Sequence, residues 1–338
     1  MTTQSRRPLD RAWDRGRLAR SEREARTAYI GETDTLTPPT VRTSSSSPYR
    51  SLVTLLLFST LIFTLACLKS TDNKNSSSNK SPSRKSNRVT NEKFRASLPP
   101  GFTLPDESDE VGNRVLADYG AVFVARGGAV PPLSVVFPND EAVTRWQSSV
   151  GQERADFGGA NIELQSPAMK ALLEARDDAR KAGLDITPRA ADAARRTYSE
   201  TVKLWKSRVD PGLMHWVNEG RLTKEEADRI RALSPRDQIP EILRLEADGL
   251  FFSTDFSKSI LYSVAAPGTS QHISMLAFDV KEYDNAKVRK ILAEHGWFQT
   301  VSSDMPHFTF LGVTEDELPS LGLKETTNGG RKFWVPDV

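Results

Sequence analysis

Two short segments near the C-terminus constrain the fold most, because each carries a histidine beside other polar side chains. The first is Ser270–Asp279, which contains His272, and the second is Asp304–Phe310, which contains His307. Two imidazoles and one carboxylate match the three protein ligands of a catalytic zinc, where water takes the fourth position. Asp304, three residues before His307, adds a second carboxylate that could serve as a base. The two segments therefore predict a shared zinc site.

The spacing of His272 and Asp279 restricts the backbone between them. Seven helical residues span about 10 Å along the axis, whereas zinc ligands lie about 2 Å from one ion. In one uninterrupted strand, an odd separation puts the two side chains on opposite faces. The chain must therefore bend, and Pro267-Gly268-Thr269-Ser270 indicates that His272 leaves a turn while Asp279 lies on the strand beyond. Pro306 likewise favours extended backbone around His307.

Other readings of these residues remain open from the residues alone. His272 and His307 could be hydrogen-bonded core or loop residues without a metal. His295 fits a helix C-terminus, where a cation is favoured, and His215 beside Trp216 looks structural. The lone Cys67 excludes an intramolecular disulfide and a cysteine-based metal cage, so any metal is held by nitrogen and oxygen.

The N-terminal third differs in character from the rest of the chain. Residues 1–50 are rich in Arg, Ser and Thr and are expected to be disordered. Residues 51–68 are uncharged and apolar between Arg50 and Lys69, which is just long enough for an uncleaved transmembrane helix. Residues 69–109 are expected to be a flexible linker. The net charge of +2 and the lack of a recognition motif argue against nucleic-acid binding.

The remaining sequence predicts an α+β fold, with a small antiparallel sheet carrying the site and several helices packed on it. Residues 110–159 are expected to be a small β-rich segment, residues 160–325 the domain that carries the site, and residues 326–338 a tail. Strands are expected over Val115–Val124, Leu133–Phe137, Leu261–Ala265, Ala277–Val280 and Phe308–Leu311. Helices are expected over Ser166–Gly183, Ala190–Val209, Thr223–Leu233, Gln238–Ala247 and Asn285–His295.

Several motifs resemble those of the zinc D-alanyl-D-alanine carboxypeptidases (the VanY-like family, with the Hedgehog/DD-peptidase fold). Ser270-Gln271-His272, six further residues and Asp279 match the family's Ser-x-His…Asp motif. Asp304-Met305-Pro306-His307 stands where the family has Glu-x-x-His. His295-Gly296-Trp297-Phe298 resembles a Tyr-Gly-Phe-like segment, and Ile186-Thr187-Pro188-Arg189 resembles an arginine-bearing strand. The resemblance covers roughly residues 160 to 315.

The resemblance implies a role for each matching residue. His272, Asp279 and His307 would bind Zn²⁺, and Asp304 would be the catalytic base. Arg189 would bind the terminal carboxylate of the substrate, a role that suits a bidentate guanidinium, and Ser270 would line the site. The implied activity is hydrolysis of a peptide bond involving D-amino acids in peptidoglycan stem peptides, as a carboxypeptidase or an endopeptidase. The implied location is the bacterial inner membrane, with a single-pass anchor and the C-terminal domain outside.

Two departures from the family pattern leave a second function open. The family glycine three residues after the first histidine is Met275, which could narrow the pocket or alter the bend. Aspartate in place of glutamate at position 304 shortens the reach of the base by about 1.5 Å, and a base must lie within hydrogen-bonding distance of its water. The alternatives are a non-catalytic peptidoglycan-binding or scaffold protein that keeps the fold, and an interaction domain without metal.

Overall fold

A computed structural model of the chain describes residues 92–338. The expected disordered tail (1–50), the expected membrane-spanning segment (51–68) and the linker before residue 92 lie outside these residues. None of the helices formed by residues 92–338 combines the length and the apolar character needed to span a bilayer.

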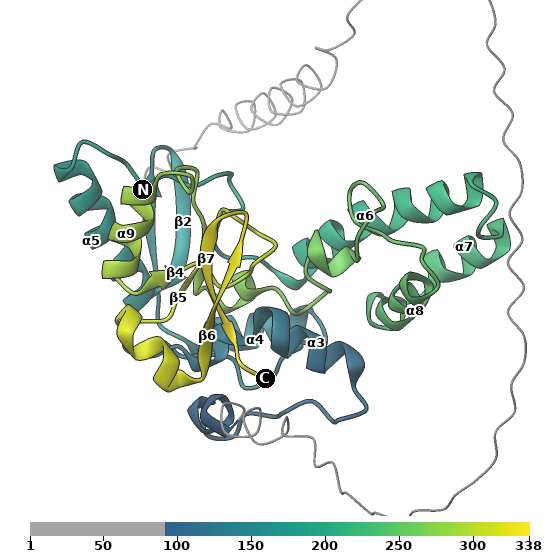
Figure 1. The fold of residues 1–338 in the computed structure, drawn as a ribbon, viewed down its shortest axis with the longest axis horizontal. Helices are drawn as coiled ribbons and strands as arrows, with labels where there is room; N and C mark the ends of the chain where they lie inside the picture. Colours follow the sequence, from purple (N-terminus) through teal and green to yellow (C-terminus); the bar gives the residue numbers. More distant parts are fainter. Residues whose placement is uncertain (1–91) are drawn as a thin grey trace, which may run out of the picture. The chain divides into compact units, whose positions relative to one another are not determined.

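The described residues form helices and small antiparallel sheets, which confirms the expected α+β class (Figure 1). The α-helices are α3 (Glu110–Tyr119), α4 (Asp140–Ser149), α5 (Ser166–Lys181), α6 (Tyr198–Asn218), α7 (Lys224–Ala232), α8 (Pro235–Ala247) and α9 (Ala286–Glu294). The 3₁₀ helices are η1 (Gly120–Val124), η2 (Ile260–Tyr262), η3 (Gln271–Ser274) and η4 (Glu315–Leu321). The strands are β1 (Gln152–Phe157), β2 (Ala160–Gln165), β3 (Ala277–Asp279), β4 (Trp297–Phe298), β5 (His307–Phe310), β6 (Leu323–Asn328) and β7 (Arg331–Pro336).

The central sheet has three strands in the order β3-β5-β4, with both pairs antiparallel. In the β3–β5 ladder, Phe278 lies opposite Phe308, and Asp279 lies opposite His307. The hairpins β1–β2 and β6–β7 form two further sheets. The backbone N–H of Gln165, at the end of β2, donates to the carbonyl oxygen of Met275 (3.0 Å), which ties the first hairpin to the loop before β3.

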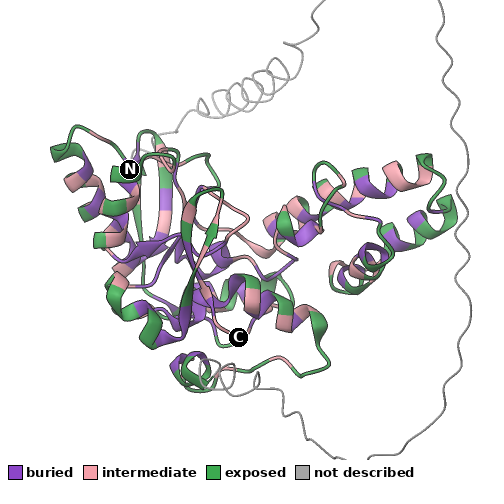
Figure 2. Cartoon of the chain, viewed as in Figure 1, coloured by how far each residue is buried: buried purple, intermediate pink, exposed green. Residues whose placement is uncertain are grey.

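Buried side chains form two separate hydrophobic clusters. The larger lies around the sheets, α5 and α9, and includes Phe278, Trp297 and Phe308. The smaller holds α6, α7 and α8 together around Trp205 and Phe252. Figure 2 shows buried residues along β4 and β5, and the helices carry both buried and exposed positions. Each cluster therefore stabilises its own group of elements.

Local signals in the sequence explain where most helices begin. Pro167 stands in the first turn of α5, where its missing N–H costs nothing. Thr223 and Glu226 form a capping box at the start of α7, as expected. The predicted helices over Ser166–Gly183, Thr223–Leu233, Gln238–Ala247 and Asn285–His295 are confirmed as α5, α7, α8 and α9, with ends shifted by up to three residues.

The strand predicted over Val115–Val124 is wrong, because these residues belong to α3 and η1. The side chain of Asp109 caps α3 by accepting a hydrogen bond from the backbone N–H of Gly112 (2.8 Å). When every residue of a run is apolar and buried, its sequence pattern does not distinguish a strand from a helix. Every residue of η1 is buried. Residues 110–159 contain α3, η1 and α4 before β1, so the segment is not β-rich.

Two further strand predictions are wrong, and one helix prediction has the wrong bounds. Leu133–Phe137 forms no strand beyond an isolated bridge between Ser134 and Thr103, and Leu261–Ala265 begins inside the 3₁₀ helix η2. The helix expected over Ala190–Val209 begins only at Tyr198, because Thr197 and Glu200 form its capping box. Residues 190–197 are thereby left as turns beside β3.

The expected linker (69–109) and C-terminal tail (326–338) are folded where they are described. Residues 92–97 are helical, and the side chain of Phe94 is fully buried in the larger cluster. Residues 326–328 continue β6, and Arg331–Pro336 forms β7. Both segments therefore belong to the folded domain.

Replacing Phe94 tests whether the chain before residue 98 is part of the core. Phe94→Ala should lower the free energy of unfolding by about 3–5 kcal/mol, the usual cost of truncating a buried phenylalanine. The adjacent exposed Lys93→Ala is the matched control and should change it by less than about 0.5 kcal/mol. Urea unfolding of the two variants makes the comparison. Equal midpoints would contradict the packing of this segment.

Candidate metal centre

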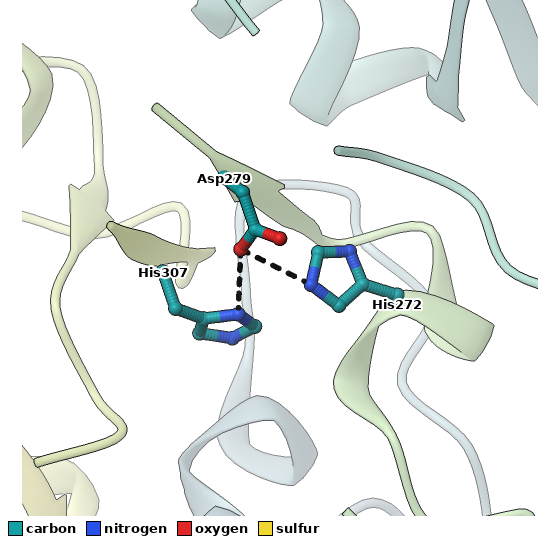
Figure 3. Close-up of side chains that lie close together, drawn as sticks. All are labelled: His272, Asp279 and His307. Carbon is teal, nitrogen blue, oxygen red and sulfur yellow. Dashed lines mark hydrogen bonds and ion pairs between the residues drawn. The ribbon is translucent and has the colours of Figure 1, made fainter. Parts of the chain in front are cut away.

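The side chains of His272, Asp279 and His307 meet in one buried cluster (Figure 3). Nε2 of His272 lies 3.3 Å from Oδ1 of Asp279, and Nδ1 of His307 lies 3.2 Å from the same oxygen. The candidate ligand atoms all lie within 4.8 Å of one another. The histidine rings are almost fully buried, and the carboxylate is 13% exposed. The group could hold a metal ion.

The backbone brings these residues together as their spacing required. His272 lies in η3, and the chain reverses at Met275 before entering β3, which ends at Asp279. Met275 has φ 55°, a left-handed conformation that costs a residue other than glycine roughly 1–2 kcal/mol. The position thus keeps the backbone that glycine favours. Its side chain is fully buried and is not among the residues that line the cavity.

Hydrogen bonds fix which nitrogen of each imidazole carries the proton. Nδ1 of His272 lies 2.7 Å from the carbonyl oxygen of Ala194, which can only accept, so Nδ1 carries the hydrogen. The amide nitrogen of Gln271 donates to the carbonyl oxygen of Tyr119 (2.7 Å), which fixes the orientation of that amide. Its oxygen therefore faces Nε2 of His307 (2.9 Å) and accepts from it. The opposite nitrogens, Nε2 of His272 and Nδ1 of His307, keep lone pairs.

These two lone pairs converge on a carboxylate oxygen, so the centre of the cluster contains acceptors and no donor. Nε2 of His272 is buried without a hydrogen-bond partner. A buried acceptor without a partner is costly, and a cation between the three atoms satisfies all of them at once. The hydrogen bonds on the far nitrogens are the support that metal-binding histidines usually receive.

Electrostatics favour the protonation states that bind a metal. Burial lowers the pKa of His272, against the opposing effect of Asp279, and keeps its imidazole neutral. Burial alone would raise the pKa of the Asp279 carboxyl, but its interactions with His272 and His307 outweigh the effect of burial. The pKa of Asp279 is therefore held well below its usual range. A neutral imidazole and an ionised carboxylate are the forms that coordinate metals.

Arg196 supports the cluster and was not expected from the sequence. One of its terminal nitrogens lies 3.0 Å from Oδ2 of Asp279, so the other carboxylate oxygen is left for the histidines. Its backbone N–H donates to the carbonyl oxygen of His272 (3.2 Å). No local pattern could have found this contact, because it joins residues 83 positions apart.

The other expected site residues line one cavity of about 490 Å³ together with the cluster. Asp304, Ser270 and Arg189 all border it. A tight turn connects Asp304 to the cluster, since its carbonyl oxygen accepts from the backbone N–H of His307 (3.2 Å). The backbone N–H of Arg189 donates to the carbonyl oxygen of Asp279 (2.9 Å), and its side chain is exposed. All six expected site residues therefore meet at one place.

Comparisons with protein-family models, with curated proteins and with solved structures gave no match. The chemistry that the site can perform thus follows from its own residues. They supply two neutral nitrogen atoms and one carboxylate that could bind a metal, a second carboxylate, and guanidinium groups around the cavity.

Replacing either histidine tests the ligand assignment. His272→Ala and His307→Ala should each lose one equivalent of bound zinc, measured by elemental analysis of the full-length protein. They should also lose the stabilisation by zinc, which is about 2.7 kcal/mol when free metal is 100 times Kd. His295→Ala is the control, because His295 pairs with Asp178 outside the cluster. Retention of one zinc by both cluster variants would refute the assignment.

Replacing Arg196 tests its support of the ligand carboxylate. Arg196→Gln should weaken zinc binding by about 10- to 100-fold, the usual effect of losing a partner that orients a ligand. Arg195→Gln removes the same charge one position earlier, where the side chain contacts Gln147 and Glu163 instead. Competition with a chromophoric chelator gives both affinities. Equal weakening by the two variants would indicate a general charge effect.

Proposed function

We propose that this protein is a zinc-dependent peptidase that hydrolyses a peptide bond involving D-amino acids in peptidoglycan stem peptides. The single observation that supports it most is the acceptor-only cluster of His272, Asp279 and His307 on the wall of an open cavity. A structural site would be closed by a fourth protein ligand, whereas a catalytic site keeps one position for water. No fourth such ligand joins the cluster among residues 92–338.

Zinc suits this ligand set for two reasons. It accepts histidine nitrogen and carboxylate oxygen together, while magnesium and calcium prefer oxygen. Two neutral ligands and one carboxylate also leave the ion a net positive charge. When bound, the ion supplies Lewis-acid polarisation of a carbonyl and lowers the pKa of a water.

Asp304 is the proposed base, because it borders the same cavity without being part of the cluster. Its carboxylate would accept a proton from the attacking water and pass it to the leaving amine. Two successive turns precede β5 and contain Asp304. The N–H of Asp304 donates to the carbonyl oxygen of Val301 (3.0 Å), and the N–H of His307 donates to that of Asp304 (3.2 Å). These hydrogen bonds hold the backbone of Asp304 beside that of His307.

Arg189 and Ser270 are the proposed substrate-binding residues. The guanidinium of Arg189 forms no ion pair with any of residues 92–338, so both of its terminal nitrogens can receive the C-terminal carboxylate of a peptide. Peptidoglycan lies outside the cytoplasmic membrane of bacteria. We therefore place residues 69–338 on that side, with residues 51–68 as a single-pass anchor.

The decisive experiment measures release of D-alanine from a peptide ending in D-Ala-D-Ala by the zinc-loaded, full-length protein. Asp304→Asn should leave zinc affinity nearly unchanged and lower the rate by about 100-fold or more, because only the base is lost. Asp304→Glu should also lower the rate if the backbone is placed for the shorter side chain.

Two outcomes would favour the alternative of a non-catalytic peptidoglycan-binding protein. One is a wild-type protein that binds zinc and the peptide and releases no D-alanine. The other is a gain of activity in Asp304→Glu, which would indicate that the native aspartate is too short. Hydrolysis that persists after zinc is removed by a chelator would contradict the zinc-dependent mechanism itself.

A further inference from the structure

A second arginine borders the cavity and is not used by the proposed mechanism. Arg208 lies in the middle of α6 and is half-buried. It lines the same cavity of about 490 Å³ as the metal cluster. The residue comes from the helical part of the domain, whereas Arg189 comes from the segment beside β3.

Hydroxyl groups position the guanidinium of Arg208 without neutralising it. Its Nε donates to Oγ of Ser263 (2.8 Å), and Nη1 donates to Oγ of Ser207 (2.9 Å). The Ser263 hydroxyl is in turn 3.1 Å from that of Thr254. In contrast, Arg196 in the same cavity pairs with two carboxylates.

The charge of Arg208 is therefore available to a ligand. Within residues 92–338, no carboxylate forms an ion pair with it. Its Nε and Nη1 donate to serine hydroxyls, and Nη1 also lies 3.5 Å from the carbonyl oxygen of Ser207. Nη2 makes no hydrogen bond within residues 92–338, so its N–H groups can donate to an anion. A partly buried cation gains more from such a partner than one in bulk water.

Two guanidiniums without carboxylate partners in one cavity indicate a ligand with two anionic groups. We propose that Arg208 recognises a second acidic group of the substrate, in addition to the terminal carboxylate that Arg189 would bind. The ligand class is a peptide with a free carboxylate on a residue before the bond to be cleaved. This inference rests on the proposed function and specifies its substrate.

The test uses two synthetic peptides that both end in D-Ala-D-Ala and differ at one group. One carries a free carboxylate on an upstream glutamyl residue, and the other carries the carboxamide there. Binding is measured by calorimetry on the zinc-loaded, full-length protein, and kcat/KM is measured from D-alanine release. The variants are Arg208→Gln and Arg208→Lys, with Lys203→Gln as the control. Lys203 is an exposed cation on the same helix that does not line the cavity.

The wild-type protein should prefer the carboxylate peptide, and Arg208→Gln should remove that preference. Its affinity and kcat/KM for the carboxylate peptide should fall by about 10- to 100-fold, the range for a hydrogen bond to a charged group. Its values for the carboxamide peptide should stay within about twofold of wild type. Arg208→Lys should restore part of the preference, because it keeps the charge and loses the fork. Lys203→Gln should behave as wild type.

Several outcomes would overturn the inference. Equal binding of the two peptides by the wild-type protein would do so, as would an equal loss for both peptides in Arg208→Gln. Preferential binding without hydrolysis would support Arg208 as the recognition residue and reject the peptidase function. Hydrolysis without preference would support the peptidase and reject the role of Arg208. Absence of both binding and hydrolysis would reject both proposals.

Discussion

The antiparallel pairing of β3 with β5 is the interaction on which the site depends. It sets Asp279 directly opposite His307, and cross-strand partners of this kind have their side chains on the same face. A slip of one residue would turn one of the two side chains to the other face. The buried pair Phe278 and Phe308, next along the ladder, fixes the register by packing into the larger hydrophobic cluster. Apolar packing therefore keeps the candidate metal ligands in place.

Much of the site follows from short-range rules. The seven-residue spacing of His272 and Asp279 required a bend, and the structure supplies it in η3 and at Met275. The sequence predicts the capping box at Thr223 directly. The capping box at Thr197 has the same pattern, although α6 was expected to begin at Ala190. Residue type and spacing thus suffice to predict the cluster of candidate ligands and most helix starts.

The remaining features depend on contacts between distant parts of the chain. Arg196 supports Asp279 across 83 positions, and nothing near it in sequence indicates this. The strand expected over Val115–Val124 is helical, and in its second half, η1, burial of every residue removes the periodicity by which the sequence could have shown this. The hairpins β1–β2 and β6–β7 were also not predicted, although the sequence contains a local signal for each. Gly158-Gly159 and Gly329-Gly330 join the strands of these hairpins with positive φ angles.

The two hydrophobic clusters have a consequence for the proposed peptidase reaction. Arg208 lies on α6, which packs in the smaller cluster, and Arg189 lies beside β3, which packs in the larger one. A ligand that binds both arginines therefore contacts elements stabilised by two different clusters. Two linked contacts bind more tightly than either alone, because the second forms at a high effective concentration. In the proposed reaction, hydrolysis of the bond between the two anionic groups would divide these contacts between two separate molecules. Each product would then keep one attachment only, so the reaction itself would weaken the binding that positioned the substrate.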